Sequence, residues 1–185
     1  MILILGLGNP GEKYQHTRHN VGFLFLDFLR ESWRFPAFAP SNRFESLLSK
    51  GEWGGHQILL GKPETYMNLS GKSVQSLLGY YKLTEKHLAA IHDDLDIAKG
   101  TLRSTHSSSA AGHNGVIDII ERIGTQDFFR IRIGIGRSED ETPTKDFVLL
   151  PLSHEEFATL HDSTFPHAKE LLEEWIIKQH SKLPS

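Results

Sequence analysis

A histidine set among polar residues is the first feature of this sequence that could do chemistry. The segment Thr17-Arg18-His19-Asn20 follows an apolar run and the turn Gly6-Leu7-Gly8-Asn9-Pro10-Gly11. Short apolar strands that end in glycine turns deliver side chains to the carboxyl edge of an α/β sheet, where ligands usually bind. His19 is therefore a candidate general base, because the ordinary pKa of histidine lies near neutral pH.

A second candidate is the acidic segment His92-Asp93-Asp94-Leu95-Asp96, which ends another predicted strand. Its three carboxylates could hold Mg²⁺, or they could form a solvated acidic turn. In a third interpretation Asp93 points at a histidine, fixes its tautomer and stabilises the imidazolium that forms on proton uptake. We favour the third, because strand ends meet at one edge of a sheet.

Asparagines also gather at predicted turns and helix starts, namely Asn9, Asn20, Asn68 and Asn114. Capping and turn chemistry explains each of them alone. Beside a base and an acid, however, they suggest amide groups that converge on a substrate carbonyl and backbone. The oxyanion donor stays open between Asn9, Asn114 and backbone amides.

The elements that would position these residues alternate short apolar runs with helical patterns, which predicts an α/β domain. Strands are predicted near residues 2–5, 44–49, 58–62, 88–93, 101–103 and 129–135. Segment 21–32 is apolar on nearly every side, which predicts a buried helix, although its length and aromatic content leave a strand as an alternative. Apolar residues spaced i, i+3, i+4 and i+7 predict two more, around Val74, Leu77, Leu78 and Tyr81 and around Val116, Ile119, Ile120 and Ile123.

Toward the end of the chain, Ser153-His154-Glu155-Glu156 predicts a capping box, and Pro166 is expected to break or kink the helix that follows. Segments 35–43, 104–111 and 138–145 are predicted loops. None is long enough to link domains. We therefore predict one domain over residues 1–185, a three-layer sandwich in which a mixed, twisted β-sheet is flanked by helices, with a C-terminal helical segment at about 153–180.

Composition excludes several classes of protein. The 185 residues contain no cysteine, which rules out thiol nucleophiles, Cys-ligated zinc and disulfides, and 20 basic against 23 acidic residues give a formal charge of −3. A polyanion partner must then meet a local basic patch. We expect a cytoplasmic protein without a signal peptide or membrane span. We expect no metal either, since eight histidines are scattered as surface residues: His16, His56, His87, His106, His154, His161, His167 and His180.

Two familiar motifs are present only in part. Gly6-Leu7-Gly8-Asn9-Pro10-Gly11 satisfies G-x-G-x-x-G, but a polar run follows it and Asp27, the acid at the right distance, lies inside a helical pattern. Gly71-Lys72-Ser73 resembles the end of a P-loop, but Tyr66 stands where the motif needs glycine. We expect neither a dinucleotide nor a nucleotide phosphate site.

Taken together, six ordered segments resemble the successive motifs of bacterial peptidyl-tRNA hydrolases over about residues 2–150. These are Gly6-Leu7-Gly8-Asn9-Pro10-Gly11, Tyr14-x-x-Thr17-Arg18-His19-Asn20-x-Gly22, Tyr66-Met67-Asn68-Leu69-Ser70-Gly71, His92-Asp93-Asp94-Leu95-Asp96, Gly112-His113-Asn114-Gly115 and Arg130-Ile131-Arg132-Ile133-Gly134-Ile135-Gly136. The resemblance implies a monomeric esterase that needs no metal, cofactor or obligate protein partner. Its substrate would be peptidyl-tRNA, cut at the ester that joins the peptide to the 3′ ribose.

The resemblance also implies a role for individual residues. His19 would activate water, Asp93 would orient it, and Asn9 would hydrogen-bond at the scissile ester. Substrate binding would fall to Tyr14, Tyr66, Met67, Asn68 and Asn114, and tRNA phosphates to Arg132, with Arg103, Lys99 and Arg137 as further candidates.

One segment departs from the family pattern. The loop before Gly112 is usually glycine-rich with a basic residue nearby, whereas here it is Ser104-Thr105-His106-Ser107-Ser108-Ser109-Ala110-Ala111. Two alternatives remain: a catalytically silent RNA-binding protein on the same scaffold, and a nucleotide-dependent oxidoreductase.

Overall fold

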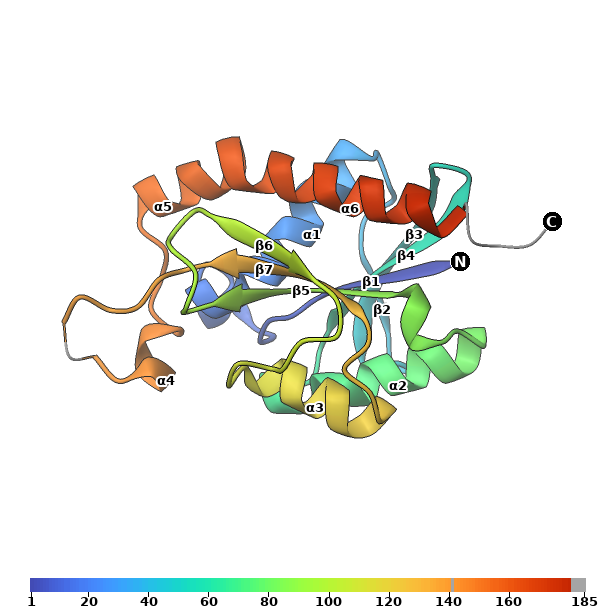
Figure 1. Ribbon diagram of the computed structural model, residues 1–185, viewed down its shortest axis with the longest axis horizontal. Helices are drawn as coiled ribbons and strands as arrows, with labels where there is room; N and C mark the ends of the chain where they lie inside the picture. Colours follow the sequence, from blue (N-terminus) through green and yellow to red (C-terminus); the bar gives the residue numbers. More distant parts are fainter. Residues whose placement is uncertain (141, 181–185) are drawn as a thin grey trace.

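The computed structural model describes residues 1–140 and 142–180 and contains one mixed sheet of seven strands (Figure 1). The strands are β1 (Ile2–Gly6), β2 (Ala39–Ser41), β3 (Ser46–Trp53), β4 (His56–Pro63), β5 (Leu88–Asp94), β6 (Leu102–Thr105) and β7 (Phe129–Gly134). Their order in the sheet is β2-β3-β4-β1-β5-β7-β6. The predicted single α/β domain is confirmed.

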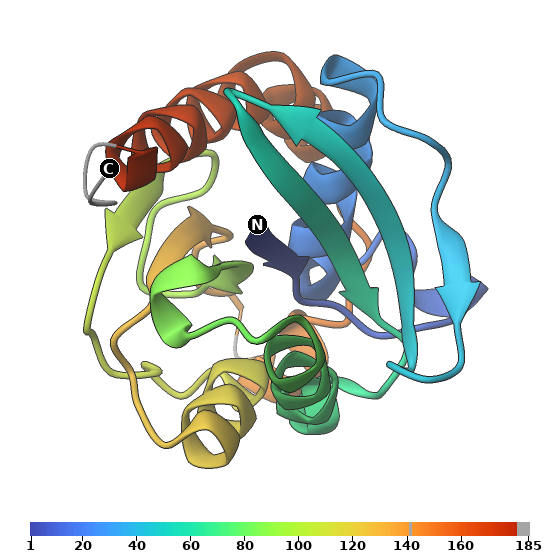
Figure 2. The ribbon, with the colours of Figure 1, turned by 90° about the vertical axis from the view of Figure 1, so that its right-hand side faces the viewer.

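Helices cover both faces of this sheet. They are α1 (Val21–Ser32), α2 (Ser70–Tyr81), α3 (Asn114–Ile123), α4 (Thr144–Phe147), α5 (His154–Thr159) and α6 (Phe165–His180), with short 3-10 turns η1 (Glu12–Tyr14), η2 (Arg18–Asn20), η3 (Met67–Leu69) and η4 (Glu85–His87) and a π-helical turn η5 (Leu160–Thr164). Figure 2, which views the sheet from its side, shows α1 and α6 on one face and α2 and α3 on the other. The three predicted layers are therefore present.

The centre of the sheet is parallel, which brings several strand ends to one edge. Strand β1 pairs in parallel with β4 and β5, and β5 pairs in parallel with β7. In Figure 1 these strands run toward the side where α4 lies. Asn9 after β1 and Asp93 near the end of β5 consequently reach the same edge.

Alternation along the strands builds two cores, one on each face. In β1, Ile2 and Ile4 pack with Phe25 of α1 and with α6, whereas Leu3 and Leu5 pack toward α2 and α3. A one-residue shift in register would exchange these two faces. The buried pattern therefore fixes where each strand ends and which side chains reach the edge.

Three predicted loops contain regular structure. Strand β2 lies inside segment 35–43, where Ala39 pairs with Leu48. Pro40 is tolerated there because β2 is the edge strand, on which a missing N–H breaks no ladder. Strand β6 continues through Thr105 and shortens the loop predicted from residue 104, and α4 forms within and beyond segment 138–145.

The helix does not break at Pro166, which was one of the two outcomes predicted there. Helical structure continues from α5 through η5 into α6, where Pro166 lies in the first turn. A π-helical turn changes which carbonyls are paired, so the missing N–H of proline is accommodated just after it. Within residues 1–140 and 142–180, no helix has the length and apolarity needed to span a membrane.

Close packing of α1 on the sheet depends on Gly22 in its first turn. A Cβ added there would lie 2.4 Å from the carbonyl oxygen of Ile91 and 2.6 Å from backbone atoms of Leu7. Backbone atoms cannot move aside as a flexible side chain can. Only glycine lets α1 approach β1 and β5 this closely.

We therefore expect Gly22→Ala to destabilise the fold by about 1–3 kcal/mol or more, because it overpacks a rigid contact. Gly79→Ala is the matched control. It lies in α2 with open space around the added Cβ, so it should be neutral or stabilising by up to about 1 kcal/mol. Urea unfolding of both variants measures the difference, and equal midpoints would contradict this packing.

Candidate active site

The imidazole of His19 is held by a carboxylate on β5, the strand beside β1 in the sheet. His19 lies in η2, its backbone N–H donates to the carbonyl of Val148 at 2.8 Å, and its ring Nδ1 lies 2.9 Å from Oδ1 of Asp93. A carboxylate only accepts, so Nδ1 carries the proton. In the neutral ring the lone pair is then on Nε2, which is the arrangement of a general base.

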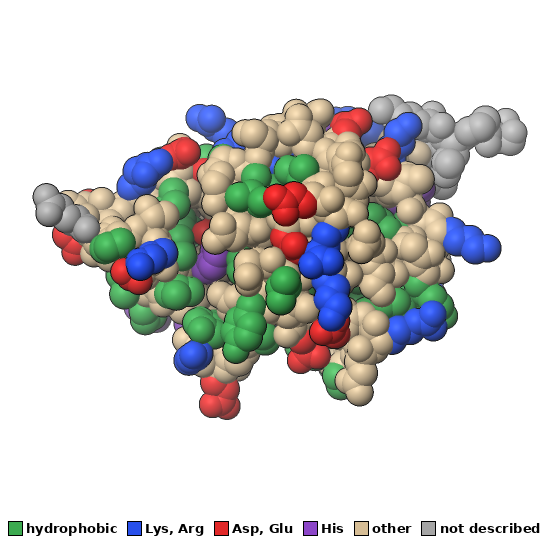
Figure 3. All heavy atoms as spheres, turned by 90° about the horizontal axis from the view of Figure 1, so that it is seen from below, with side chains coloured by type: hydrophobic (Ala, Val, Ile, Leu, Met, Phe, Trp, Pro, Cys, Tyr) green, Lys and Arg blue, Asp and Glu red, His purple; other side chains and the backbone are tan. Residues whose placement is uncertain are grey.

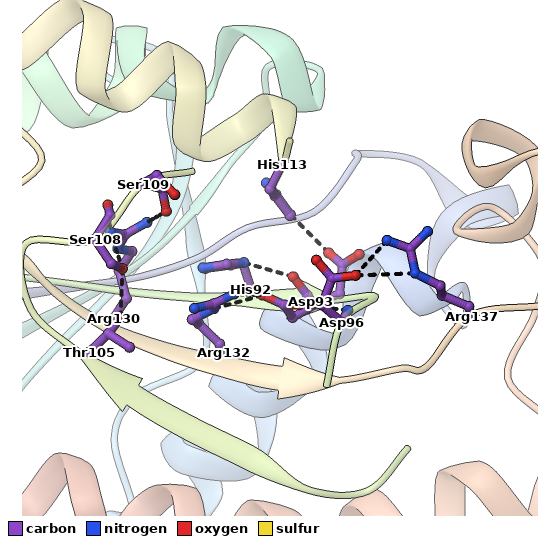
Figure 4. Close-up of polar contacts among 11 residues, drawn as sticks. His92, Asp93, Asp96, Thr105, Ser108, Ser109, His113, Arg130, Arg132 and Arg137 are labelled. Atoms are coloured by element: carbon purple, nitrogen blue, oxygen red, sulfur yellow. Dashed lines mark hydrogen bonds and ion pairs between the residues drawn. The ribbon is translucent and has the colours of Figure 1, made fainter. Parts of the chain in front are cut away.

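The carboxylate of Asp93 also accepts from a second imidazole, His113, which we did not single out from the sequence. Its Nε2 lies 2.9 Å from the same Oδ1 (Figure 4). The N–H of Val116 donates to Nδ1 of His113 at 3.3 Å, which sets this tautomer. The segment Gly112-His113-Asn114-Gly115 at the start of α3 was the available signal, and we credited only its asparagine.

This network shifts the pKa values of its members in opposite directions. Burial lowers the pKa of His19, but the charge and hydrogen bond of Asp93 outweigh it and raise the pKa above 6.5. Burial would raise the pKa of Asp93, yet the two histidines hold it well below its usual range. Asp93 therefore stays charged, and its charge favours proton uptake by His19.

His92 holds the backbone at Asp93 and remains neutral. Its Nδ1–H donates to the backbone carbonyl of Asp93 at 2.7 Å, and its ring packs edge-on against His113 at 4.6 Å between centroids. Burial, and then the neighbouring His113, lower the pKa of His92 well below 6.5. A neutral ring thus fixes the backbone that carries the carboxylate.

The acidic segment does not converge on a cation. While Asp93 binds two histidines, Asp94 pairs with Arg132 at 2.7 Å, so the carboxylates have different partners. The third, Asp96, pairs with Arg137 (Figure 4). This arrangement gives no support to the Mg²⁺ alternative. Ligand atoms of His19, Asp93 and His113 do lie within 4.8 Å of one another. Both ring nitrogens that face Asp93 carry protons, however, which favours a proton network over a metal site.

A cleft of about 360 Å³ opens beside the histidine and the carboxylate. Asn114, exposed at the start of α3, lines it together with Val148 and Arg137. The cleft gives a substrate access to His19. Of the predicted amides, Asn114 is the one that shares this lining.

Asn9 does not line this cleft but lines a separate hollow of about 380 Å³ with Asn20. Its backbone exchanges two hydrogen bonds with the side chain of Asn20, at 2.8 and 2.9 Å. Its own Oδ1 accepts from the N–H of Met67 at 2.9 Å. The side-chain NH₂ of Asn9 is thereby oriented and left to donate. Asn20 therefore fixes the turn that carries Asn9.

The remaining predicted substrate residues follow two neighbouring strands, with Tyr66, Met67 and Asn68 after β4 and Tyr14 after β1. Tyr66 is 58% exposed, Asn68 is exposed and Met67 is buried between them, all at η3. Tyr14 ends η1, and the ammonium of Lys13 lies 4.7 Å from its ring centroid. These residues offer an apolar and aromatic surface but do not line the cleft of His19.

The atypical loop after β6 is fastened by a buried arginine. Arg130 donates to the carbonyls of Ser108 and Ser109 and to the Ser108 hydroxyl (Figure 4). Burial and the charge of Arg132 lower the pKa of Arg130 to about 10. Ser107 and Ala111 adopt left-handed φ values of 50° and 48°, a conformation that glycine adopts more readily. The loop keeps its shape at some cost in strain.

The predicted phosphate contacts do not form one patch. Arg132 is engaged by Asp94 and only 15% of its side chain is exposed, and Lys99 lies beside Glu156 at another cavity. Arg103 is exposed on β6 opposite Arg132, and Arg137 is 67% exposed at the cleft. Figure 3 shows basic and acidic side chains interspersed on the α2 and α3 side. Arg103 and Arg137 are thus the better-placed cations.

Comparison with known proteins places this chain in a family. A family model described as peptidyl-tRNA hydrolase matches residues 3–184. The chain belongs to the peptidyl-tRNA hydrolase family. Peptidyl-tRNA hydrolase of Brevibacillus brevis is 47% identical over 80% of this chain and 78% of the relative, and that of Bacillus subtilis is 42% identical over 88% and 86%. The crystal structure of peptidyl-tRNA hydrolase from Acinetobacter baumannii superposes with a TM-score of 0.88 at 32% identity, covering 98% of this chain and 90% of that one.

The raised pKa of His19 generates a direct prediction. In Asp93→Asn the attraction is lost while burial remains, so the pKa of His19 should fall below 6.5. An NMR titration of the ring measures it. Asp96→Asn, which alters an exposed pair with Arg137, should leave His19 unchanged. A His19 pKa that stays raised in Asp93→Asn would contradict this electrostatic account.

Proposed function

We propose that this chain hydrolyses the ester between a peptide and the 3′ ribose of tRNA by means of a water molecule activated by His19. The single observation that carries the proposal is the imidazole whose Nδ1 is bound to a buried carboxylate beside an open cleft. A silent RNA-binding surface has no need of such a pair. In addition, α1 begins only at Val21 and not inside the glycine turn, which argues against a dinucleotide site.

The chemistry follows from the tautomer. Nε2 of His19 takes a proton from water as the water oxygen attacks the ester carbonyl, and Asp93 stabilises the imidazolium formed. The tetrahedral intermediate then collapses, the carbon–oxygen bond to the ribose breaks, and His19 returns the proton to the leaving 3′ oxygen. An ester is activated enough for this route to need no covalent intermediate.

The other site residues are proposed to bind and orient the substrate. The oriented NH₂ of Asn9 is a donor for the ester region, and Asn114 is placed to contact substrate in the cleft of His19. Tyr14, Tyr66 and Met67 would offer apolar contact to the peptide, and Asn68 would offer an amide. Arg103 and Arg137 would meet tRNA phosphates, with Arg132 and Lys99 adding a weaker field because their side chains are less exposed, at 15% and 47% against 67% for Arg137.

We further propose that the protein acts in the cytoplasm as a monomer without a metal, cofactor or protein partner. The family's substrate class and the completeness of the catalytic pair within one chain support this proposal.

The decisive assay compares N-acetylaminoacyl-tRNA with the same tRNA carrying a free amino acid. We expect release of the acylated amino acid only, since the substrate must resemble a peptide. Cleavage of neither, or of both at equal rates, would contradict the proposed function.

We expect His19→Ala to lower kcat by about 10²- to 10⁴-fold, the usual contribution of general base catalysis, while the protein stays folded. In the unaltered protein, kcat/KM should rise with pH through a limb above 6.5, because only the neutral ring accepts a proton and Asp93 raises its pKa. A folded His19→Ala variant with near-normal turnover would remove His19 from the mechanism.

Arg103→Ala should raise KM for the tRNA substrate with little change in kcat and should reduce the salt dependence of binding by about one phosphate contact. Lys86→Ala is the matched control. It removes an exposed charge at η4, which directly precedes β5. Lys86 therefore lies at the start of β5, whereas Asp93 lies near its end. Equal salt slopes for both variants would place the phosphates elsewhere.

A further inference from the structure

The backbone just before and at His19 is paired with a segment far along the chain. The N–H of Arg18 donates to Leu150 at 3.2 Å, and the N–H of Leu152 donates to His16 at 2.8 Å. Together with the bond from His19 to Val148, these form a short ladder between residues 16–19 and 148–152. The position of His19 therefore depends on where this distant segment lies.

The side chain of Arg18 fastens the same segment a second time. Its Nη1 donates to the carbonyls of Pro151 at 2.9 Å and Leu150 at 3.3 Å. Its Nη2 donates to both carboxylate oxygens of Glu156, at 2.8 and 2.7 Å. The guanidinium also lies 4.8 Å from the ring centroid of Phe147. Such a planar fork restricts both distance and orientation, which a lysine cannot do.

Glu156 is itself fixed at the start of α5. Its carboxylate accepts from the N–H of Ser153 at 2.7 Å, and its own N–H donates to the Ser153 hydroxyl at 3.1 Å. Lys99 lies 3.6 Å away. Burial would raise the pKa of Glu156, but Ser153 and Arg18 outweigh it and keep the carboxylate charged. The C-terminal helical segment thus presents a rigid anion to Arg18.

The segment held in this way is also a wall of the catalytic cleft. Val148 lines the cleft beside His19, and α4, at the start of this segment, contributes Thr144 and Lys145. If the ion pair between Arg18 and Glu156 loosened, both His19 and the wall of the cleft that faces the substrate would move. A displacement of this kind weakens catalysis before it weakens binding, because reaction needs closer alignment than association.

We propose that Arg18 and Glu156 are positioning residues for the reaction, a clamp through which the C-terminal helical segment sets the place of His19. This inference rests on the proposed function. It assigns neither residue a contact with substrate. It makes the helical segment after residue 153 part of the catalytic apparatus and not only a cover of the sheet.

The test replaces Glu156 by glutamine, which has nearly the same shape but lacks the charge and one acceptor oxygen. We expect kcat to fall about tenfold or more with KM within about twofold, since ångström-scale misplacement costs up to about 100-fold. Glu155→Gln is the matched control. Glu155 is exposed and lines the same cavity as Arg18, Lys99 and Glu156, but it does not join the clamp. Its kinetics should match the unaltered protein.

A second readout separates positioning from general stability. In folded Glu156→Gln the NMR signals of the His19 ring should shift, whereas those in Glu155→Gln should not. Arg18→Lys keeps the charge but loses the fork, so it should lower kcat in the same way, and it decides the question if Glu156→Gln does not fold.

The outcomes are distinguishable from those of the parent proposal. If the unaltered protein does not cleave N-acetylaminoacyl-tRNA, the proposed function fails. If it cleaves this substrate while folded Glu156→Gln and Arg18→Lys keep its kcat and its His19 signals, the clamp is overturned. A change in KM alone would also overturn it, because it would place the pair in substrate binding.

Discussion

The site depends on one buried carboxylate that accepts hydrogen bonds from two imidazoles. Asp93 would be costly to bury alone, but the donors on His19 and His113 make its charged form the stable one. The charge in turn fixes both tautomers and leaves a lone pair on Nε2 of His19. Base strength and orientation thus come from the same contact.

The fold brings this contact about through strand ends. Parallel pairing of β1, β4, β5 and β7 carries the residues after each strand to one edge, and Gly22 lets α1 begin close enough for His19 to reach β5. On the far side, residues 148–152 pair with the backbone at His19. The base is therefore held between the sheet and the C-terminal third of the chain.

Much of this architecture could be predicted from the sequence because it depends on local patterns. Apolar spacing predicted α2 and α3, the nearly continuous apolarity of segment 21–32 predicted α1, and the strand-end rule placed His19 near Asp93. Strand β2 was missed because its two exposed residues, Ala39 and Pro40, have no strand signature apart from pairing with β3. The role of His113 was missed because its place as the N-cap of α3 accounts for the residue without any partner in β5. The pairing of Arg132 with Asp94 was not foreseen, since nothing in a sequence shows that these two residues meet.

The most direct test is the ¹⁵N NMR spectrum of the His19 ring at a pH where it is neutral. The arrangement with Asp93 predicts a proton on Nδ1 and a pyridine-type nitrogen at Nε2. A proton found on Nε2 in the neutral ring would contradict the account, because His19 would then have no lone pair with which to activate water.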